Sequence, residues 1–296
     1  MPTLSNRRLL IAPLVALVLV ASALPAGAQR ASRRILLPYI EQTRPCLATG
    51  SSYELIPVEA TPEIRYTVET NPDFNLTVRG WVTNTDPSLR RLVDYNGGFD
   101  LNAPQLYGLF ADGRTPVLTS THRVYDWDWS NNRRGAPISA WPVTLLGMAT
   151  APGETLHLPG RGPDIYQGRF HAMVLYASEQ RITWTYTRFG YISSPQGGYG
   201  VHVENGCVDP NLVALYNAAH AAGRGSLPGL RGGQPFGRAR TSEILVAIRD
   251  TGSFMDPRSR KDWWRGRAAQ EGDSAGGQPR PPAPTPLPTP SPTPEP

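Results

Sequence analysis

The chain has 296 residues, of which 40% are hydrophobic, and its formal net charge at pH 7 is +5. Its 29 basic residues only slightly outnumber its 24 acidic residues, and no block of like charges stands out. Nucleic-acid-binding proteins concentrate Lys and Arg on one face or in one segment, so this charge pattern gives that function no support. The length allows one domain or two small ones.

The first 28 residues have the pattern of a secretory signal peptide. Arg7 and Arg8 form a positive start, residues 9–24 form an apolar stretch, and Ala26-Gly27-Ala28 is a small-residue cleavage site. A single membrane anchor is the alternative, but the stretch is short and Pro13 interrupts it. No later run is long and apolar enough to span a bilayer, so we expect a secreted, extracytoplasmic chain without a membrane span after cleavage.

Cys46 and Cys207 are the two cysteines of the sequence. In an exported protein, an even and widely separated pair is most simply one disulfide, and two reactive thiols are the alternative. A disulfide would connect the start of the mature chain with the region before its last strands.

Alternating patterns and turn residues predict mostly β structure from residue 64 onward. Apolar residues alternate with polar ones in short runs that Gly, Pro, Asn and Asp separate. The runs are residues 64–68, 76–81, 104–110, 116–118, 124–129, 143–148, 170–176, 181–187, 199–203 and 244–248. The runs 170–176 and 181–187 should form a hairpin, because only a short connection separates them.

The run that ends at Trp129 alternates strictly between aromatic and acidic residues. On a strand, Tyr125, Trp127 and Trp129 share one face, whereas Asp126 and Asp128 share the other. An aromatic row can stack on sugar rings, and neighbouring carboxylates can bind hydroxyl groups or a cation. The alternative is that the aromatic residues belong to the core and the aspartates are solvated.

One short helix is predicted at about residues 209–222. Asp209 is a suitable N-cap, Pro210 occupies the first helical position, and Gly223 ends the helical pattern. A Gly-rich turn at 233–237 should then lead into the last apolar run.

From Ala268 onward the sequence is rich in proline, threonine and serine. Proline at nearly alternate positions favours an extended chain, and the segment has no apolar face to bury, so we expect a disordered spacer. We therefore divide the chain into a signal peptide (1–28), an N-terminal β-rich region (29–130), a second β domain (131–267) and a tail (268–296). The expected fold is mainly β, an antiparallel sheet or β-sandwich-like domain with the one short helix.

Several stretches between residues 143 and 257 follow one another in the order of a known β core. They are the hairpin from Val174 to Ile182, the motif Gly198-Tyr199-Gly200-Val201-His202-Val203, the turn Gly233-Gln234-Pro235-Phe236-Gly237, and the exit formed by Ile248-Arg249, Gly252 and Asp256-Pro257. This pattern resembles the lysostaphin-type (LytM-like) zinc endopeptidases, which cut peptidoglycan cross-bridges. The resemblance implies a peptidase-like β fold.

The residues that hold zinc in that family do not occur at the matching positions. Its late H-x-H pair falls on Glu243 and Leu245, and its early H-x-G-x-D pattern falls near Leu145, Gly147 and Ala149. A catalytic zinc needs about three protein ligands and a water. The resemblance therefore implies either a degenerate, non-catalytic relative or a shared β architecture alone, and in both cases we expect no metal and no other cofactor.

The first functional hypothesis is a secreted, non-enzymatic protein of the cell envelope or the extracellular space. It would bind peptidoglycan or another glycan, and it would have no nucleic-acid partner. Its expected ligand contacts are the aromatic side chains of Tyr125, Trp127, Trp129, Trp184 and Tyr199.

The second hypothesis is an active peptidoglycan or polysaccharide hydrolase. Its acid and base groups would come from separate segments, with Asp126, Asp128, Glu204 and Glu243 as the candidates. Asp126 and Asp128 lie on one face of one strand and are too close together to flank a glycosidic bond. The hypothesis therefore requires a cleft in which carboxylates from different segments converge. A purely structural envelope protein is a third alternative.

Overall fold

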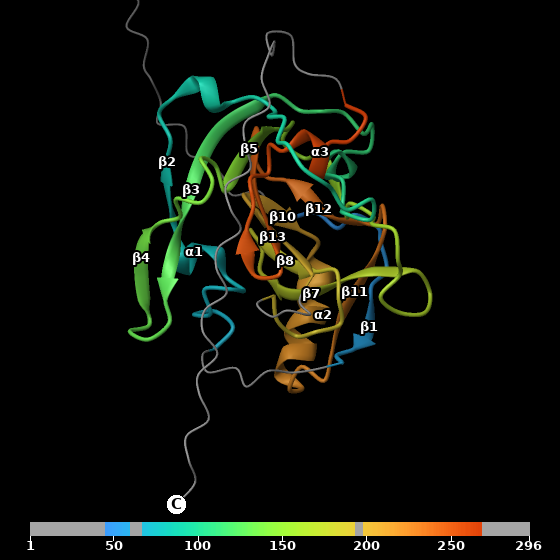
Figure 1. Cartoon of the computed structure of the whole chain (residues 1–296). Helices are drawn as coiled ribbons and strands as arrows, with labels where there is room; N and C mark the ends of the chain where they lie inside the picture. The colour runs from blue at the N-terminus through green and yellow to red at the C-terminus, as the bar shows by residue number, and fades with distance from the viewer. Residues whose placement is uncertain (1–44, 60–66, 193–197, 268–296) are drawn as a thin grey trace, which may run out of the picture. The chain divides into compact units, whose positions relative to one another are not determined.

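The structure is a computed structural model that describes residues 45–59, 67–192 and 198–267. The predicted signal peptide, the predicted tail and most of the predicted strand at 64–68 lie outside these residues. The described chain is mainly β and its strands pair antiparallel, as the sequence predicts (Figure 1).

A sheet of 11 strands forms the body of the protein. Its strand order is β1-β11-β7-β8-β9-β13-β5-β3-β2. Outside this order, β14 pairs with β13, and β4 pairs with β3. The strands are β1 (Glu54–Pro57), β2 (Trp81–Thr83), β3 (Leu118–Asp128), β4 (Arg133–Pro137), β5 (Leu145–Ala149), β7 (Phe170–Ala177), β8 (Ile182–Thr185), β9 (Tyr199–Glu204), β11 (Ser226–Arg231), β13 (Glu243–Asp250) and β14 (Ser253–Phe254). Strands from both predicted regions, residues 29–130 and residues 131–267, therefore share one sheet.

A second sheet has three strands in the order β10 (Gly206–Val208), β12 (Pro235–Ala239) and β6 (Thr155–His157). The predicted turn at 233–237 thus extends into a strand from Pro235 onward. Gly237 is required there, because a Cβ atom at this position would lie 2.6 Å from the carbonyl oxygen of Cys207 on β10.

The predicted helix is confirmed as α2 (Pro210–Ala221). The Asp209 carboxylate caps it by accepting a hydrogen bond from the Asn211 amide at 2.8 Å. The other helical segments are short, namely α1 (Leu76–Arg79), α3 (Arg260–Trp263) and the 3-10 turns η1 (Pro87–Leu89) and η2 (Leu106–Leu109).

Two of the predicted strands are wrong, because the residues form two of these helical turns instead. Residues 76–79 form α1, where the Asn75 side chain caps the turn by accepting a hydrogen bond from the Thr77 amide. The turn places Leu76 and Arg79, three residues apart, on its buried side. Likewise, the run 104–110 contains η2, whose Leu106 and Leu109 are buried at the same spacing.

The central strands of the main sheet bury both of their faces. On β13, Ile244, Val246 and Ile248 enter the main hydrophobic core, whereas Leu245 and Ala247 enter a smaller second core on the opposite face. The second core also contains Leu76, Val124, Leu145 and Phe254. Because successive side chains of a strand point to opposite faces, a nearly continuous apolar run is needed for this double burial.

The predicted disulfide is confirmed. Cys46 and Cys207 are joined, and the bond connects the segment before β1 to β10. Polar contacts hold the same segment, since the Thr49 amide and hydroxyl both donate to the Asp209 carboxylate, at 2.6 and 2.7 Å. Asp209 therefore caps α2 and anchors the incoming chain with one side chain.

We predict that the C46A/C207A double variant is destabilised. The disulfide closes a loop with a sequence separation of 161 residues, for which the loop-entropy model gives about 4–5 kcal/mol. The contacts of Thr49 remain, so we expect a loss of about 2–4 kcal/mol in the free energy of unfolding in urea. A loss below about 0.5 kcal/mol would show that the polar contacts alone hold this segment.

Candidate functional site

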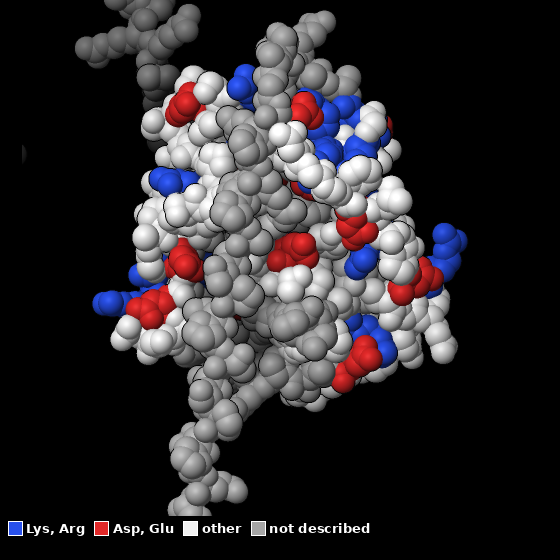
Figure 2. Space-filling model, in the orientation of Figure 1, with Lys and Arg blue, Asp and Glu red and all other residues white. Residues whose placement is uncertain are grey.

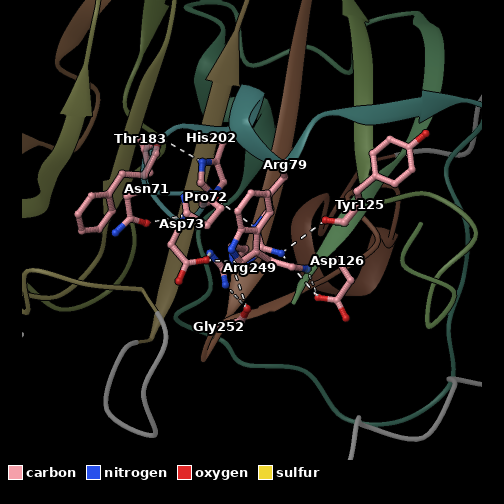
Figure 3. Close-up of polar contacts among 12 residues, drawn as sticks. Asn71, Pro72, Asp73, Arg79, Tyr125, Asp126, Thr183, His202, Arg249 and Gly252 are labelled. Atoms are coloured by element: carbon pink, nitrogen blue, oxygen red, sulfur yellow. Dashed lines mark hydrogen bonds and ion pairs between the residues drawn. The ribbon is translucent and has the colours of Figure 1, made fainter. Parts of the chain in front are cut away.

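Polar side chains gather on the face of the main sheet that carries the second core, which we call the polar face. Alternation along β13, β9 and β3 places Glu243 and Arg249, His202 and Glu204, and His122 on this face. The segment of residues 71–79, which includes α1, lies against it (Figure 3). The Thr183 hydroxyl of β8 contributes to this contact by donating to the Phe74 carbonyl oxygen at 2.7 Å.

Asp73 is the centre of a buried ionic network on the polar face (Figure 3). One carboxylate oxygen of Asp73 accepts from Arg249 at 2.7 Å and from Arg79 at 2.8 Å. Burial alone would raise the pKa of Asp73, but the two guanidinium groups outweigh it and hold the pKa well below its usual range. Arg79 also lies 3.6 Å from Asp126, whose side chain is 73% exposed.

His202 lies beside this network and is fully buried. Its Nδ1 atom is 2.9 Å from the Thr183 hydroxyl, and its Nε2 atom has no hydrogen-bond partner among the described residues. The ring stacks on Phe254. Burial, reinforced by the charge of Arg249, lowers the pKa of His202 well below its usual value, so the imidazole is neutral at pH 7.

We predict that D73N costs about 3–5 kcal/mol of stability at pH 7, because it leaves two buried arginines without their counter-charge. D126N is the matched control, because it removes an exposed carboxylate beside the same Arg79 and should cost about 1 kcal/mol or less. Because the pKa of Asp73 is lowered on folding, its contribution is present above pH 4 and is lost as the pH falls below that. Urea unfolding from pH 2 to 7 should therefore show a shallower acid loss for D73N, and equal costs for D73N and D126N would contradict the network.

A second polar group, which we call the hydroxyl cluster, lies where β3 begins. Thr119 and Ser120 both donate to Oε1 of Glu243, at 2.5 and 2.6 Å. Ser120 Oγ is also 2.8 Å from Nε2 of His122, and Nδ1 of His122 is 3.0 Å from the Thr83 hydroxyl. Both hydroxyls use the same oxygen of Glu243, so the second oxygen is not engaged by them.

Backbone irregularity and a glycine create this cluster. The register of β3 against β5 shifts between Leu118 and Ser120, which is a bulge that turns two successive hydroxyl side chains toward Glu243. Gly147 on β5 lies beneath them, and a Cβ atom there would come within 2.1 Å of Ser120 Oγ and 2.3 Å of Glu243 Oε1. Any other residue at 147 would thus push these two side chains apart.

The number of protons on each hydroxyl and on the imidazole fixes the direction of the hydrogen bonds in the cluster. Ser120 has one hydroxyl proton, which it donates to Glu243, so it must accept from Nε2–H of His122. Nδ1 of His122 is then unprotonated and accepts from Thr83. This neutral imidazole agrees with the pKa of His122, which burial lowers even though Glu243 acts in the opposite direction.

Glu204 occupies the same face but has its own partner. Its carboxylate is buried and accepts from Arg181 Nε at 2.9 Å. Desolvation by burial outweighs the favourable charge of Arg181 and raises the pKa of Glu204 to about 7. Glu204 is therefore partly protonated near neutral pH, unlike an ordinary surface glutamate.

We predict a pH-dependent difference in stability between the wild type and E204Q. The pKa of Glu204 is raised on folding, so the native protein binds more protons than the unfolded chain between about pH 4.5 and 7, and its stability relative to E204Q should fall as the pH rises through this window. The fall should be up to about 3 kcal/mol, measured by urea unfolding at pH 5, 6, 7 and 8. We compare the wild type with E204Q because the lowered pKa values of His122 and His202 make the stability of the wild type rise with pH, which opposes the effect of Glu204. A difference that stays constant with pH would contradict the raised pKa.

The aromatic row of Tyr125, Trp127 and Trp129 belongs to neither hydrophobic core. β3 has 11 residues and its neighbour β5 has five, so the end of β3 extends past β5 and pairs there with β4. Trp129 lies in the turn directly after β3, not on the strand as the alternating pattern predicts, and is 44% exposed. Trp127 is half-buried, and Tyr125 is half-buried under the guanidinium of Arg134 at 5.1 Å. Tyr125 and Asp126 point in opposite directions, as alternation predicts (Figure 3).

Two other predicted ligand contacts lie in the core instead. Trp184 is fully buried and packs on Phe236 with ring centroids 5.3 Å apart. Tyr199 is 9% exposed, packs edge-on against Trp263 and donates to Asp100 at 3.1 Å. In this structure neither ring has a face open to a ligand, because each alternates onto the main-core side of its strand.

The four candidate catalytic carboxylates have separate partners. Glu204 pairs with Arg181, Glu243 with the two hydroxyls, and Asp126 with Arg79. Asp128 bonds Asn131 and Arg133 at the far end of β3. Within residues 45–59, 67–192 and 198–267, no three His, Cys, Asp or Glu side chains lie together in a way that could hold a metal ion.

Sequence reasoning missed most of the hydroxyl cluster and the Asp73 network. The Thr119-Ser120-Thr121-His122 run, with three hydroxyls before a histidine on a strand, was a usable signal for the cluster. The partners of Asp73 were not accessible, because Arg249 is 176 residues away in sequence.

No family model, curated protein or solved structure that was compared with the chain matches it. None of the helices in the described part of the chain combines the length and the apolar character needed to cross a membrane.

Proposed function

We propose that this protein is a non-enzymatic binding protein that acts outside the cytoplasm and recognises a glycan, with peptidoglycan as the first candidate. The observation that carries the proposal is the position of Tyr125, Trp127 and Trp129 outside both cores, at the end of β3 that pairs with β4 and in the turn that follows it. Aromatic side chains usually join a core. Aromatic side chains that stay outside the cores at one end of a strand instead offer apolar surface to a polymer.

The hydroxyl cluster supports recognition of a ligand rich in hydroxyl groups. It offers a carboxylate oxygen that Thr119 and Ser120 do not engage, beside half-exposed hydroxyl groups. Trp81 on β2 adds an aromatic ring beside His122, with ring centroids 6.4 Å apart. Carboxylates and hydroxyls next to an aromatic face are suited to bind sugar hydroxyls while a ring stacks.

The separate partners of the four carboxylates favour binding over hydrolysis. Asp126 and Asp128 share a strand face, and Glu204 and Glu243 bond to different groups. General acid–base cleavage of a glycosidic bond requires two carboxyl groups that face the same bond from different sides. The disulfide between Cys46 and Cys207 supports an oxidising location outside the cytoplasm.

We further propose a distant relationship to the lysostaphin-type peptidases, without their zinc site. Its support is the register of two strands. Ala149 pairs with Glu243 and Gly147 pairs with Leu245, so the two segments that carry ligands in that family are direct neighbours in this sheet. The side chains at these positions are mostly apolar, which agrees with a binding role rather than peptidase activity.

We predict that W127A/W129A loses binding to insoluble peptidoglycan or polysaccharide in pull-down assays, by about tenfold or more in affinity, since aromatic anchors often contribute more than 1.4 kcal/mol each. F99S/L101S is the control, because it removes exposed apolar side chains from another segment and should leave glycan binding unchanged. Circular dichroism melts verify that both variants fold. Failure of the wild type to bind any glycan, or full binding by W127A/W129A, would contradict the proposal.

A further inference from the structure

The loop of residues 96–102 holds two large apolar side chains in solvent. Leu101 is 76% exposed and Phe99 is 51% exposed. Single exposed apolar residues are ordinary on protein surfaces. Here the two lie on alternate residues of one loop, and the surroundings of the loop make the arrangement informative.

Three cations fix the backbone of this loop, which we call the apolar loop. Lys261 donates to the carbonyl oxygen of Gly98 at 2.8 Å. Arg265 donates to the carbonyl oxygens of Asp100 and Leu101, at 2.9 and 2.8 Å. Arg161 donates to the carbonyl oxygen of Asn102 at 3.3 Å. These bonds hold the backbone of the loop, and the Arg265 guanidinium also lies over the Phe99 ring, 5.5 Å from its centroid.

The framework leaves positive charge at the base of the loop. Arg161 and Arg265 donate to neutral carbonyl groups, and neither forms an ion pair within the described residues. Asp100 directs its carboxylate to the Tyr199 hydroxyl and the Asn102 amide. Lys and Arg side chains gather on the surface over α3 and the segment after it (Figure 2). The loop therefore combines an apolar tip with a cationic base.

We propose that the apolar loop docks onto a lipid bilayer that contains anionic lipids. Phe99 and Leu101 enter the boundary between headgroups and acyl chains, while Arg161 and Arg265 lie at the level of the lipid phosphates. A glycan fits this surface less well than an anionic bilayer. It has no apolar interior that could take up Leu101, and glycans in general do not carry anionic groups. With two apolar side chains and a few charges, docking is weak, reversible and sensitive to salt.

Sedimentation with large unilamellar vesicles tests this proposal. The full chain and its variants are mixed with phosphatidylcholine vesicles, with or without 30% phosphatidylglycerol, at low and high salt. We expect binding to the anionic vesicles that falls at least fivefold in F99S/L101S and in high salt. L47S is the control, because Leu47 is 66% exposed elsewhere and should not matter. Residues 1–28 are the same in every sample and cannot produce a difference between variants.

Three outcomes would overturn the proposal. They are no binding of the wild type to anionic vesicles, equal binding of wild type and F99S/L101S, and equal binding to neutral and anionic vesicles. A protein partner for this loop would give the first outcome. W127A/W129A, which removes the proposed glycan contacts, should bind vesicles like the wild type, so failure of one proposal is distinguishable from failure of the other.

Discussion

The buried carboxylate of Asp73 holds the layer that covers the polar face. It accepts hydrogen bonds from Arg79 in the covering segment and from Arg249 in the sheet, so a single side chain ties the two together. Arg249 also donates to the carbonyl oxygen of Gly252 and thereby fixes the turn between β13 and β14. Leu76 of the covering segment and Phe254 of β14 pack together in the second core on the same face.

β3 connects the hydroxyl cluster, the second core and the aromatic row. At its start, a bulge and Gly147 place hydroxyl groups around Glu243. In its middle, Val124 packs into the second core. At its far end, β3 extends past β5 and places Tyr125 and Trp127 outside both cores, and Trp129 lies in the turn that follows. The length of one strand relative to its neighbour thus decides which of its side chains pack into a core and which stay outside both cores.

Local patterns predicted the elements whose structure is set by neighbouring residues. The hairpin of β7 and β8 and the α2 helix with its Asp209 cap are confirmed. The disulfide is also confirmed, but its prediction rested on the number of cysteines and not on a local pattern. The strand predicted at 76–81 is wrong, because docking of Leu76 and Arg79 onto the sheet outweighs the alternating pattern. Side-chain burial could not be predicted from alternation alone. Trp127 and Trp184 both lie in alternating strand patterns, yet only Trp184 has a core on its side of the sheet.

The candidate site was predictable only in part, for a related reason. The strand period identified the aromatic row, and the resemblance to the lysostaphin-type peptidases singled out Glu243. The partners of Glu243 depend on the register between β3, β5 and β13, and a one-residue bulge in β3 sets that register. Nothing in the spacing of Thr119 and Ser120 reveals that both side chains reach one carboxylate oxygen.

If the aromatic row is the ligand-binding surface, as we propose, indole NMR will show it most directly. The chain has seven tryptophans, each with one indole N–H signal. Upon titration with soluble peptidoglycan fragments, we expect the signals of Trp127 and Trp129 to shift, whereas those of the buried Trp184 and Trp264 stay in place. A titration that leaves Trp127 and Trp129 unchanged, while other signals shift, would contradict the account.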